Sequence, residues 1–410
     1  MFNTLRYLLI FIALTCIMVV DASPKKKPSR VKKKAPAPVN YEHKYFIPLK
    51  TVPSGYAQFA DLNENKLQSL PLAFFKERDH FYILDKLKNK VVLTIHPRVQ
   101  GILEEEVSKV KAHTVALVVI SPKDGKILGY AGKSVSVPNP VLHNNYKIAS
   151  LFKIITAAAA VDFARIDPHF PVQFRGGFYE LSYFNFYPNA VKDNRKMSLE
   201  EGLARSVNPV FARLAIQFLN EKLLMYYSDR FGFNWKFSGD FEVPVSRGYV
   251  PSDQYELART AAGFGSIFLS PIHAALIISS IGNHGFMMAP KVVDRVITSR
   301  GDILYSFRPT VLSKTMAKES AYKLLRSMIS THTMGTAKNS FKGSNVSWLV
   351  SGKTGTLSIE DPKGLMLSYA GVFPVNDPQY SLAVFVVNSS NTSSKATAVA
   401  RRVIEKILWK

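Results

Sequence analysis

The chain has 410 residues, 47% of them hydrophobic and 20% charged, a balance that excludes a wholly disordered protein and is typical of a globular protein with a real core. Its formal net charge is +23, and seven of the positive charges lie within residues 25–34, which leaves about +16 for the rest. This surplus suits polyanionic partners, but charge alone does not distinguish nucleic acid, anionic lipid and charged envelope polymers. No aromatic-basic signature of nucleic-acid binding accompanies it.

The sequence predicts no metal site, no cofactor and no disulfide. Its only cysteine, Cys16, lies in the N-terminal apolar stretch, so the remaining chain has neither a disulfide nor thiol chemistry. The nine histidines are scattered, and none belongs to an HExxH motif or to a paired His/Cys cluster. We therefore expect a protein that works without a bound metal or cofactor.

The pattern of residues 1–22 predicts a signal peptide or, if it is not cleaved, a membrane anchor. Arg6 precedes an apolar run over residues 7–20, which is shorter than the ~20 residues of a spanning helix but suits a signal-peptide core. Cleavage would follow Ala22. We expect an exported protein, in the periplasm or at the outer face of the cytoplasmic membrane, and export excludes a nucleic-acid binder.

Two segments precede the main domain. Residues 23–40 are rich in proline, lysine and alanine, and burial cannot offset the ordering entropy of such a composition. We therefore predict a disordered tether whose positive charge suits polyanions of the cell envelope. Residues 41–112 are predicted to form a small lead-in subdomain, with a strand at 90–95 and an amphipathic helix at 99–111.

Residues 113–410 are predicted to form one domain whose sheet is completed from both ends. Apolar runs and turn residues predict two early strands, at 114–120 and 127–130, and three late strands, at 347–358, 367–373 and 380–387. About two hundred mostly helical residues separate the two sets, and a helix from about residue 397 closes the chain. The predicted fold class is α+β: a five-stranded antiparallel sheet flanked by helices, with a large helical insertion.

The first motif with chemical meaning is Ser150-x-x-Lys153, at the start of a strongly helical run over residues 151–165. Positions three apart lie on one helix face, so the hydroxyl and the amine can come within hydrogen-bonding distance. A serine with a base beside it, at a helix N-terminus that favours developing negative charge, suits nucleophilic catalysis. The four-residue pattern is weak by itself, because it begins at four other serines as well: Ser23, Ser29, Ser108 and Ser320.

The second motif is Ser206-x-Asn208, which is followed by Pro209 and comes directly after a predicted helix over residues 198–204. A hydroxyl and a carboxamide two residues apart can point from such a bend into one cleft. A turn that merely caps the next helix would give the same pattern, and a second S-x-N begins at Ser389.

The third motif is Lys353-Thr354-Gly355-Thr356, within a predicted strand; Lys-Thr-Gly occurs nowhere else in the chain. Alternation places Lys353 and Gly355 on one strand face, with Thr354 and Thr356 on the other. Glycine weakens a strand but allows a substrate backbone to come close, as in peptide binding along a strand edge. A bulge glycine in an ordinary sheet is the alternative explanation.

The three motifs, in this order along the chain, resemble those of the transpeptidase domain of penicillin-binding proteins, relatives of the serine β-lactamases. The resemblance covers roughly residues 90–410. It extends to the segments 92–97, 116–132, 263–265, 269–274, 282–290 and 335–337, although His96 stands where an aspartate is usual.

The resemblance implies that Ser150 attacks the carbonyl of a D-Ala-D-Ala stem peptide of peptidoglycan and forms an acyl-enzyme. Lys153 would accept the serine proton, which requires its pKa to fall from ~10.4 to about 7–8. Ser206 would relay a proton to the leaving amine, and Asn208 would hold the substrate amide. β-Lactam antibiotics would be covalent inhibitors.

The resemblance also implies how the third motif acts. Lys353, Thr354 and Thr356 would bind the terminal carboxylate of the substrate beside Gly355. The backbone amides of Ser150 and Thr356 would form the oxyanion hole.

Several alternatives stay open at this point. A D,D-carboxypeptidase shares the acyl-enzyme and differs only in using water, not an amine, to resolve it. A sensor module would be acylated without turning over, and a scaffold would keep the fold without the activity, although the intact Ser150, Lys153 and Lys353 argue against the latter. A β-lactamase is disfavoured, because no E-x-x-L-N segment follows Ser206.

Overall fold

The computed structural model describes residues 45–47, 50–51, 59–60, 73–237 and 240–409, all of which belong to one compact unit. The predicted signal segment 1–22 and tether 23–40 lie outside the described residues. The boundary predicted at residue 112 stays a prediction.

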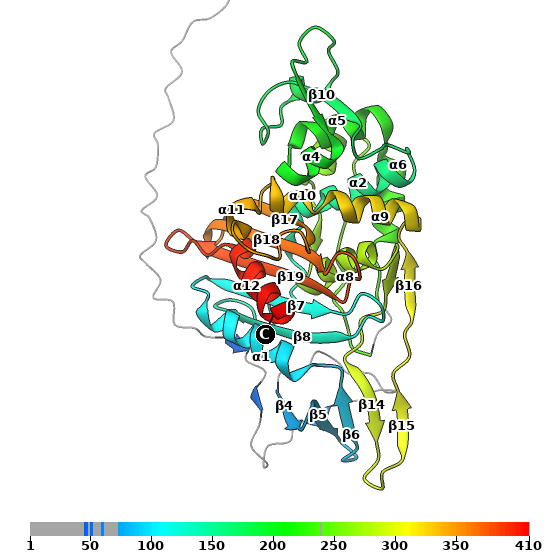
Figure 1. Cartoon of the computed structure of the whole chain (residues 1–410), viewed down its shortest axis with the longest axis vertical. Coiled ribbons are helices and arrows are strands. Elements are labelled where there is room, and N and C mark those ends of the chain that lie inside the picture. Colours follow the sequence, from blue (N-terminus) through cyan, green and yellow to red (C-terminus); the bar gives the residue numbers. More distant parts are fainter. Residues whose placement is uncertain (1–44, 48–49, 52–58, 61–72, 238–239, 410) are drawn as a thin grey trace, which may run out of the picture. The chain divides into compact units, whose positions relative to one another are not determined.

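An antiparallel sheet of six strands lies at the centre of this unit, in the order β1-β8-β7-β19-β18-β17 (Figure 1). Five of the strands are those that the sequence predicts, so the expected α+β sheet is confirmed. The sixth, β1, pairs with β8. The bounds are β1 Tyr45–Ile47, β7 Thr114–Ile120, β8 Ile127–Ser134, β17 Ser351–Glu360, β18 Lys363–Phe373 and β19 Tyr380–Ser389.

Helices cover both faces of the sheet. All seven residues of β7 are buried. On one face of β7, Val115, Leu117 and Val119 pack with α1 (Pro97–Lys109) and α12 (Ala396–Trp409). On the other face, Val118 belongs to the hydrophobic cluster that includes α8 (Pro271–Gly282). A strand buried on both faces has a continuous apolar run in place of strict alternation. This explains why the strand is easily recognised in the sequence.

A buried ion cluster joins α1 to the C-terminal helix. Glu106 of α1 is fully buried and accepts hydrogen bonds from Arg402 Nε and Lys406 Nζ of α12, both at 2.6 Å. Burial raises the pKa of Glu106, but the bonds from Lys406 and Arg402 outweigh it, so that the pKa is lowered. The carboxylate therefore stays charged and fixes α12 against the early part of the domain.

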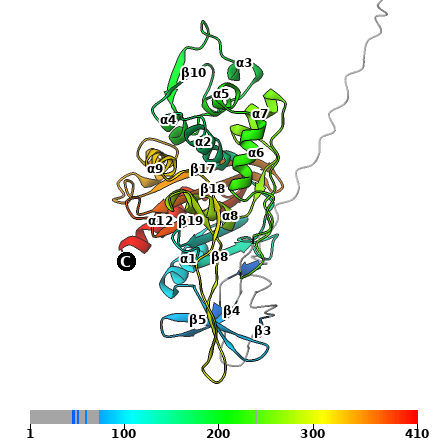
Figure 2. The same cartoon turned by 90° about the vertical axis from the view of Figure 1, so that its right-hand side faces the viewer.

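The segment between the early and the late strands is mostly helical, as predicted, and most of its helices gather on one side of the sheet (Figure 2). They are α2 Lys153–Asp162, α3 Tyr183–Phe186, α4 Leu199–Arg205, α5 Asn208–Phe218, α6 Glu221–Arg230, α7 Gln254–Ala261, α9 Lys318–Ser327, α10 Ser330–Thr333 and α11 Lys338–Phe341, besides α8. Short strands connect them: β9 Tyr146–Lys147, β10 Pro171–Phe174, β11 Arg195–Ser198, β12 Phe268–Leu269, β13 Phe286–Met288 and β16 Val311–Lys314.

A second sheet lies at the far end of the main sheet from these helices (Figure 1). It combines β4 (Ala73–Glu77), β5 (His80–Asp85) and β6 (Lys90–Leu93) with a hairpin of the insertion, β14 (Val293–Ile297) and β15 (Ile303–Ser306), and β14 pairs with β6. The sequence predicts β6 but not the hairpin. The hairpin lacks a local signal because its strand β14 pairs with β6, about two hundred residues away in the sequence.

Candidate active site

Ser150 lies in a short 3-10 turn, Ala149–Phe152, that leads directly into α2. The predicted helix therefore begins slightly later than expected, with Lys153 as its first residue. Lys153 Nζ lies 2.9 Å from Ser150 Oγ, as the spacing predicts. Ser150 is partly exposed and Lys153 is fully buried, so the hydroxyl stays accessible while the amine is shielded from water.

Lys153 has two further acceptors. Its Nζ lies 2.7 Å from Asn208 Oδ1 and 2.6 Å from the carbonyl oxygen of Ala262, at the C-terminal end of α7. Burial lowers the pKa of Lys153 well below its ordinary value, and the positive charge of Lys353 lowers it further. The geometry holds the amine in place, and the burial makes its neutral form accessible.

Ser206 and Asn208 lie at a sharp junction between two helices. The helix α4 begins with a capping box, in which Ser198 Oγ accepts from the amide of Glu201 and Glu201 Oε2 accepts from the amide of Ser198. It ends at Ser206, whose φ of 59° lies in the left-handed region, and Asn208 opens α5 with Pro209 after it. The predicted bend is thus present, and it directs both side chains toward the two lysines.

The third motif lies on β17, an edge strand of the central sheet. Lys353 is fully buried, and its Nζ lies 2.9 Å from both Ser206 Oγ and the carbonyl oxygen of Thr354. Thr354 is mostly buried, with its Oγ1 2.6 Å from Thr336 Oγ1, whereas Thr356 is exposed. The structure therefore brings the second and third motifs together through Lys353 and Ser206.

Burial also lowers the pKa of Lys353, to about 7. Lys153 and Lys353 lie close enough for the charge of Lys353 to influence Lys153. Two amines in one buried site titrate as a pair, so one proton is lost more readily than it would be from either lysine in water. Burial and the charge of Lys353 therefore both favour the neutral form of Lys153, and burial favours the neutral form of Lys353.

Two glycines let the chain pack tightly around the nucleophile candidate. A Cβ at Gly263, where φ is +99°, would lie 2.4 Å from the carbonyl oxygen of Ala149 and 2.9 Å from the amide nitrogen of Ser150. A Cβ at Gly355 would lie 2.3 Å from Ser368 Oγ and 3.6 Å from Ala149 Cβ. A side chain at position 355 would therefore collide with atoms of the protein itself. The sequence suggests another reason for this glycine, namely that it lets the backbone of a substrate come close.

Three supporting contacts were not predicted from the sequence. Two are made by backbone carbonyls, which leave no signature in a sequence: Ala262 accepts from Lys153, and Tyr179 accepts from Asn208 Nδ2 at 2.6 Å. The third is Thr336, whose amide donates to the carbonyl of Ala204 and whose hydroxyl contacts Thr354. Thr336 lies in the segment 335–337, which resembles the family, and this resemblance could have identified it as a candidate site residue.

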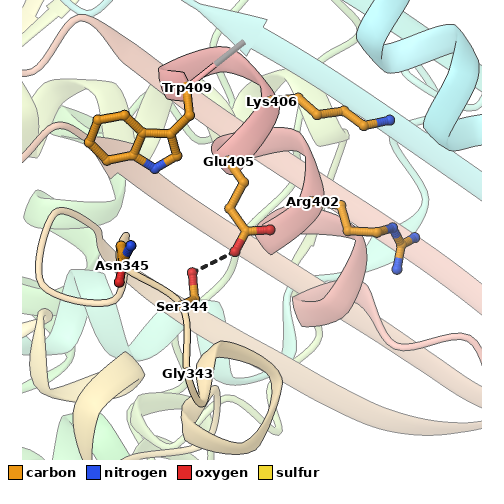
Figure 3. Close-up of a pocket in the computed structure, with 7 residues that line it drawn as sticks. All are labelled: Gly343, Ser344, Asn345, Arg402, Glu405, Lys406 and Trp409. Atoms are coloured by element: carbon orange, nitrogen blue, oxygen red, sulfur yellow. Dashed lines mark hydrogen bonds between the residues drawn. The ribbon is translucent and has the colours of Figure 1, made fainter.

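A pocket of about 300 Å³ lies away from this site, between α12 and the loop after α11 (Figure 3). Its polar groups include Ser344 Oγ, which donates to Glu405 at 2.7 Å. None of the predicted site residues lines it, so it is separate from the lysine and serine cluster. The lining residues are Gly343, Ser344, Asn345, Arg402, Glu405, Lys406 and Trp409.

Within the described part of the chain, no three His, Cys, Asp or Glu side chains are grouped so that they could hold a metal ion. A search of the same residues finds no helix with the length and apolar character needed to cross a membrane.

The central antiparallel sheet with helices on both faces, and the two serine–lysine pairs beside its edge strand, agree with the resemblance to penicillin-binding transpeptidase domains. The family model "Penicillin binding protein transpeptidase domain" matches residues 115–405. The chain therefore belongs to the family of penicillin-binding protein transpeptidase domains.

Individual relatives agree with this assignment. The chain is 26% identical to stage V sporulation protein D of Bacillus subtilis over 77% of this chain and 52% of the relative. It is 21% identical to penicillin-binding protein PbpB of Mycolicibacterium smegmatis over 72% of this chain and 50% of the relative. The chain thus spans about half the length of the curated relatives it matches.

Solved structures share the fold. The D,D-transpeptidase domain of a peptidoglycan glycosyltransferase from Eggerthella lenta has a TM-score of 0.64 at 22% identity, covering 78% of this chain and 83% of that one. PBPA from Mycobacterium tuberculosis has a TM-score of 0.65 at 23% identity, with the same coverage.

Proposed function

We propose that this protein is a serine D,D-transpeptidase that cross-links peptidoglycan by acylating Ser150 with a D-Ala-D-Ala stem peptide. The observation that carries the proposal is the pair of fully buried lysines, each within 2.9 Å of a serine hydroxyl: Lys153 with Ser150, and Lys353 with Ser206. Burying two amines costs stability, and titratable groups with pKa values lowered in this way cluster at functional sites.

The acylation step follows from these contacts. Neutral Lys153 takes the proton of Ser150 as Oγ forms a bond to the carbonyl carbon of the penultimate D-Ala. When the tetrahedral intermediate collapses, the C–N bond to the terminal D-Ala breaks. Ser206 passes a proton to the leaving amine and regains one from the lysine pair, so the proton taken from Ser150 leaves with D-Ala.

The second half of the reaction reverses these roles. The amine of a second stem peptide attacks the ester carbonyl, and its proton passes through Ser206 to the lysine pair. Lys153 returns a proton to Ser150 Oγ as the ester bond breaks. A water in place of the amine would give a D,D-carboxypeptidase with the same acyl-enzyme.

Substrate binding is proposed to use the free edge of β17. The donor peptide would lie along this strand, with Asn208 on its amide and Lys353, Thr354 and Thr356 on its terminal carboxylate. The exposure of Thr356 supports its share of this role, whereas the hydroxyl of Thr354 already contacts Thr336. The amides of Ser150 and Thr356 would stabilise the oxyanion, a contribution of ~3–4 kcal/mol per donor.

Two further parts of the proposal concern inhibitors and location. The solved acyl-enzyme complexes of M. tuberculosis penicillin-binding protein A with penicillin G and imipenem support covalent binding of β-lactams. The signal-like segment 1–22 supports action outside the cytoplasm, in the periplasm or on the outer face of the membrane. The basic tether at 23–40 would contact envelope polyanions there.

Labelling with a fluorescent penicillin tests the nucleophile. The wild type should label, and Ser150→Ala should not. Ser108→Ala is the matched control, because Ser108 begins another S-x-x-K pattern on the exposed side of α1 and should label like the wild type. Equal labelling of Ser150→Ala and wild type would overturn the assignment.

A second assay separates transfer from hydrolysis. Release of labelled D-Ala is followed with and without an acceptor amine, and the acylated peptide is recovered. A cross-linked product in the presence of the amine supports the transpeptidase. Release of D-Ala with only the hydrolysed peptide as product, whatever the amine concentration, would make the protein a D,D-carboxypeptidase.

A further inference from the structure

A strip of aromatic rings with one arginine begins beside the nucleophile candidate and continues across α7 to α3. It consists of Phe264, Arg259, Tyr255, Tyr183 and Tyr187, and we name it the aromatic strip. Successive members lie 5.1–6.2 Å apart, measured between ring centroids or from the guanidinium carbon to a ring. The strip is continuous although its members come from three segments of the chain.

The inner end of the strip adjoins the catalytic centre. Phe264 follows Gly263, which packs against the amide of Ser150, and Ala262 accepts a hydrogen bond from Lys153. Phe264 is 40% exposed. The first ring of the strip therefore belongs to the segment that packs against the turn carrying Ser150.

The outer end of the strip is open to solvent but firmly held. Tyr183 is 66% exposed, yet the helix α3 that carries it packs on α5 and α7 through the fully buried Phe186. Arg213 of α5 is also fully buried and donates to the carbonyl of Asn185 at 2.9 Å. The exposed rings are thus preorganised, which lowers the entropy cost of binding a ligand.

A buried ion pair completes the anchorage of this segment. The two Nη atoms of Arg213 lie 2.7 and 2.9 Å from the oxygens of Asp193, which is itself nearly buried. At the α7 side, Tyr187 Oη donates to Gln254 Oε1 at 3.0 Å. Aromatic rings that are exposed, as at Tyr183 and Phe264, or half-buried, as at Tyr255 and Tyr187, form a continuous row on this firmly held segment, and such a row is typical of a binding surface.

We propose that the aromatic strip binds the glycan strand to which the donor stem peptide is attached. This inference rests on the proposed function, because the glycan is brought to the strip by the stem peptide that is held at Ser150. A short extended peptide spans about 3.3 Å per residue, so the sugars of the donor come within reach of a surface that starts at Phe264. Aromatic faces pack against the C–H faces of pyranose rings, and tyrosine hydroxyls bond to sugar hydroxyls.

The charge of the strip favours a sugar over a second stem peptide. Its one cation, Arg259, has Glu256 Oε2 at 3.5 Å from its Nε, so a carboxylate-bearing peptide would meet a charge that is already balanced. The binding of a neutral, polyhydroxylated ligand is not weakened by the ion pair between Arg259 and Glu256. Such a ligand can still accept hydrogen bonds from the guanidinium. The chemistry therefore fits N-acetylhexosamine units.

Selectivity between two substrates tests the proposal. Acylation is measured with a stem peptide alone and with the same peptide on its glycan, in wild type, Tyr183→Ala and Tyr255→Ala. The wild type should prefer the glycan-linked substrate, and each variant should reduce that preference about tenfold. Tyr322→Ala, which removes an exposed tyrosine on α9, is the control and should keep the wild-type preference. No preference in the wild type, or an unchanged preference in both variants, would overturn the proposal.

Direct binding separates this inference from the proposed function. A β-1,4-linked N-acetylglucosamine oligosaccharide and peptidoglycan glycan strands stripped of their peptides are titrated into the folded protein. The wild type and Tyr322→Ala should bind, and Tyr183→Ala and Tyr255→Ala should bind about tenfold more weakly. Competition by free stem peptide and not by glycan would make the strip a peptide site and overturn the proposal. Failure of the proposed function appears differently, as a lack of penicillin labelling at Ser150.

Discussion

The side-chain amine of Lys153 lies 2.7 Å from Asn208 Oδ1, and this contact joins the helix after the nucleophile candidate to the helix that the second motif opens. The other atom of the same carboxamide, Nδ2, donates to the carbonyl of Tyr179. The amide is therefore fixed with its oxygen toward Lys153, as a neutral acceptor. A neutral acceptor orients the amine without favouring its charged form as strongly as a carboxylate would.

Asn208→Asp should shift the pH dependence of acylation to the alkaline side. A carboxylate in contact with Lys153 favours the ammonium form, so the pKa of Lys153 should rise toward its ordinary value. Because the base must be neutral, the rate at pH 7 falls and is recovered at higher pH. The measurement is the second-order rate constant of penicillin acylation from pH 6 to pH 10.

Asn208→Leu is the matched control for charge, because it removes the acceptor without adding a carboxylate. It should lower the rate but should not move the midpoint to higher pH. An alkaline shift of the same size in Asn208→Leu would mean that the charge of the aspartate is not the cause, and the role given to Lys153 would have to be withdrawn.

Lys353 should make the stability of the protein increase with pH. Burial lowers its pKa from 10.5 to about 7, so between these values the unfolded chain binds a proton that the folded protein does not. The free energy of unfolding should therefore rise across this window, by up to ~4 kcal/mol from this residue. Urea unfolding at pH 7 and pH 10 measures it, with Lys353→Met as the reference. The free energy of unfolding of the wild type minus that of Lys353→Met should rise from pH 7 to pH 10, and a value that stays constant or falls contradicts the lowered pKa.

The central sheet could be predicted largely because its inner strands are buried on both faces. The run from Thr114 to Ile120 is wholly buried, and such runs stand out in any sequence. The hairpin of β14 and β15 could not be predicted, since its strands are short and β14 pairs with β6, far away in sequence. Long-range pairing of this kind leaves no local pattern.

The site was partly predictable for a similar reason. Serine, lysine and asparagine at fixed spacings identify Ser150, Lys153 and Asn208, and the structure brings all three together. The carbonyl of Ala262 contributes as much to holding Lys153, but any residue could supply it. The motifs therefore predict which side chains come together. The backbone groups that hold these side chains can be identified only from the three-dimensional structure.

Gly263→Ala should impair acylation far more than it impairs folding. The new Cβ would lie 2.4 Å from the carbonyl of Ala149, so the turn that carries Ser150 has to move. A displacement of about 1 Å at a reacting group can cost ~10²-fold in rate. Gly301→Ala is the matched control: its φ of +96° is similar, but nothing lies within 4 Å. It should lose only ~1–2 kcal/mol of stability and keep its acylation rate. Equal acylation rates in the two variants would exclude the packing argument.

Removing one partner of the Arg213–Asp193 pair should be more harmful than removing both. Arg213→Met leaves a nearly buried carboxylate with reduced compensation and should cost ~3–5 kcal/mol of unfolding free energy. Adding Asp193→Leu should recover part of the loss, although Arg175, which also contacts Asp193, then loses its partner. Denaturant unfolding of the two single variants and the double variant gives the coupling energy. A double variant that loses the sum of the single effects would show that the two side chains act independently.

The most direct test of the account is where a β-lactam attaches. The wild-type protein is treated with penicillin G, its mass is measured intact, and the proteolytic peptides are then mapped. The account predicts one adduct per chain, on Ser150, and no adduct in folded Lys153→Met, where the base is missing. An adduct on any other serine, or an equally fast adduct in folded Lys153→Met, would contradict it.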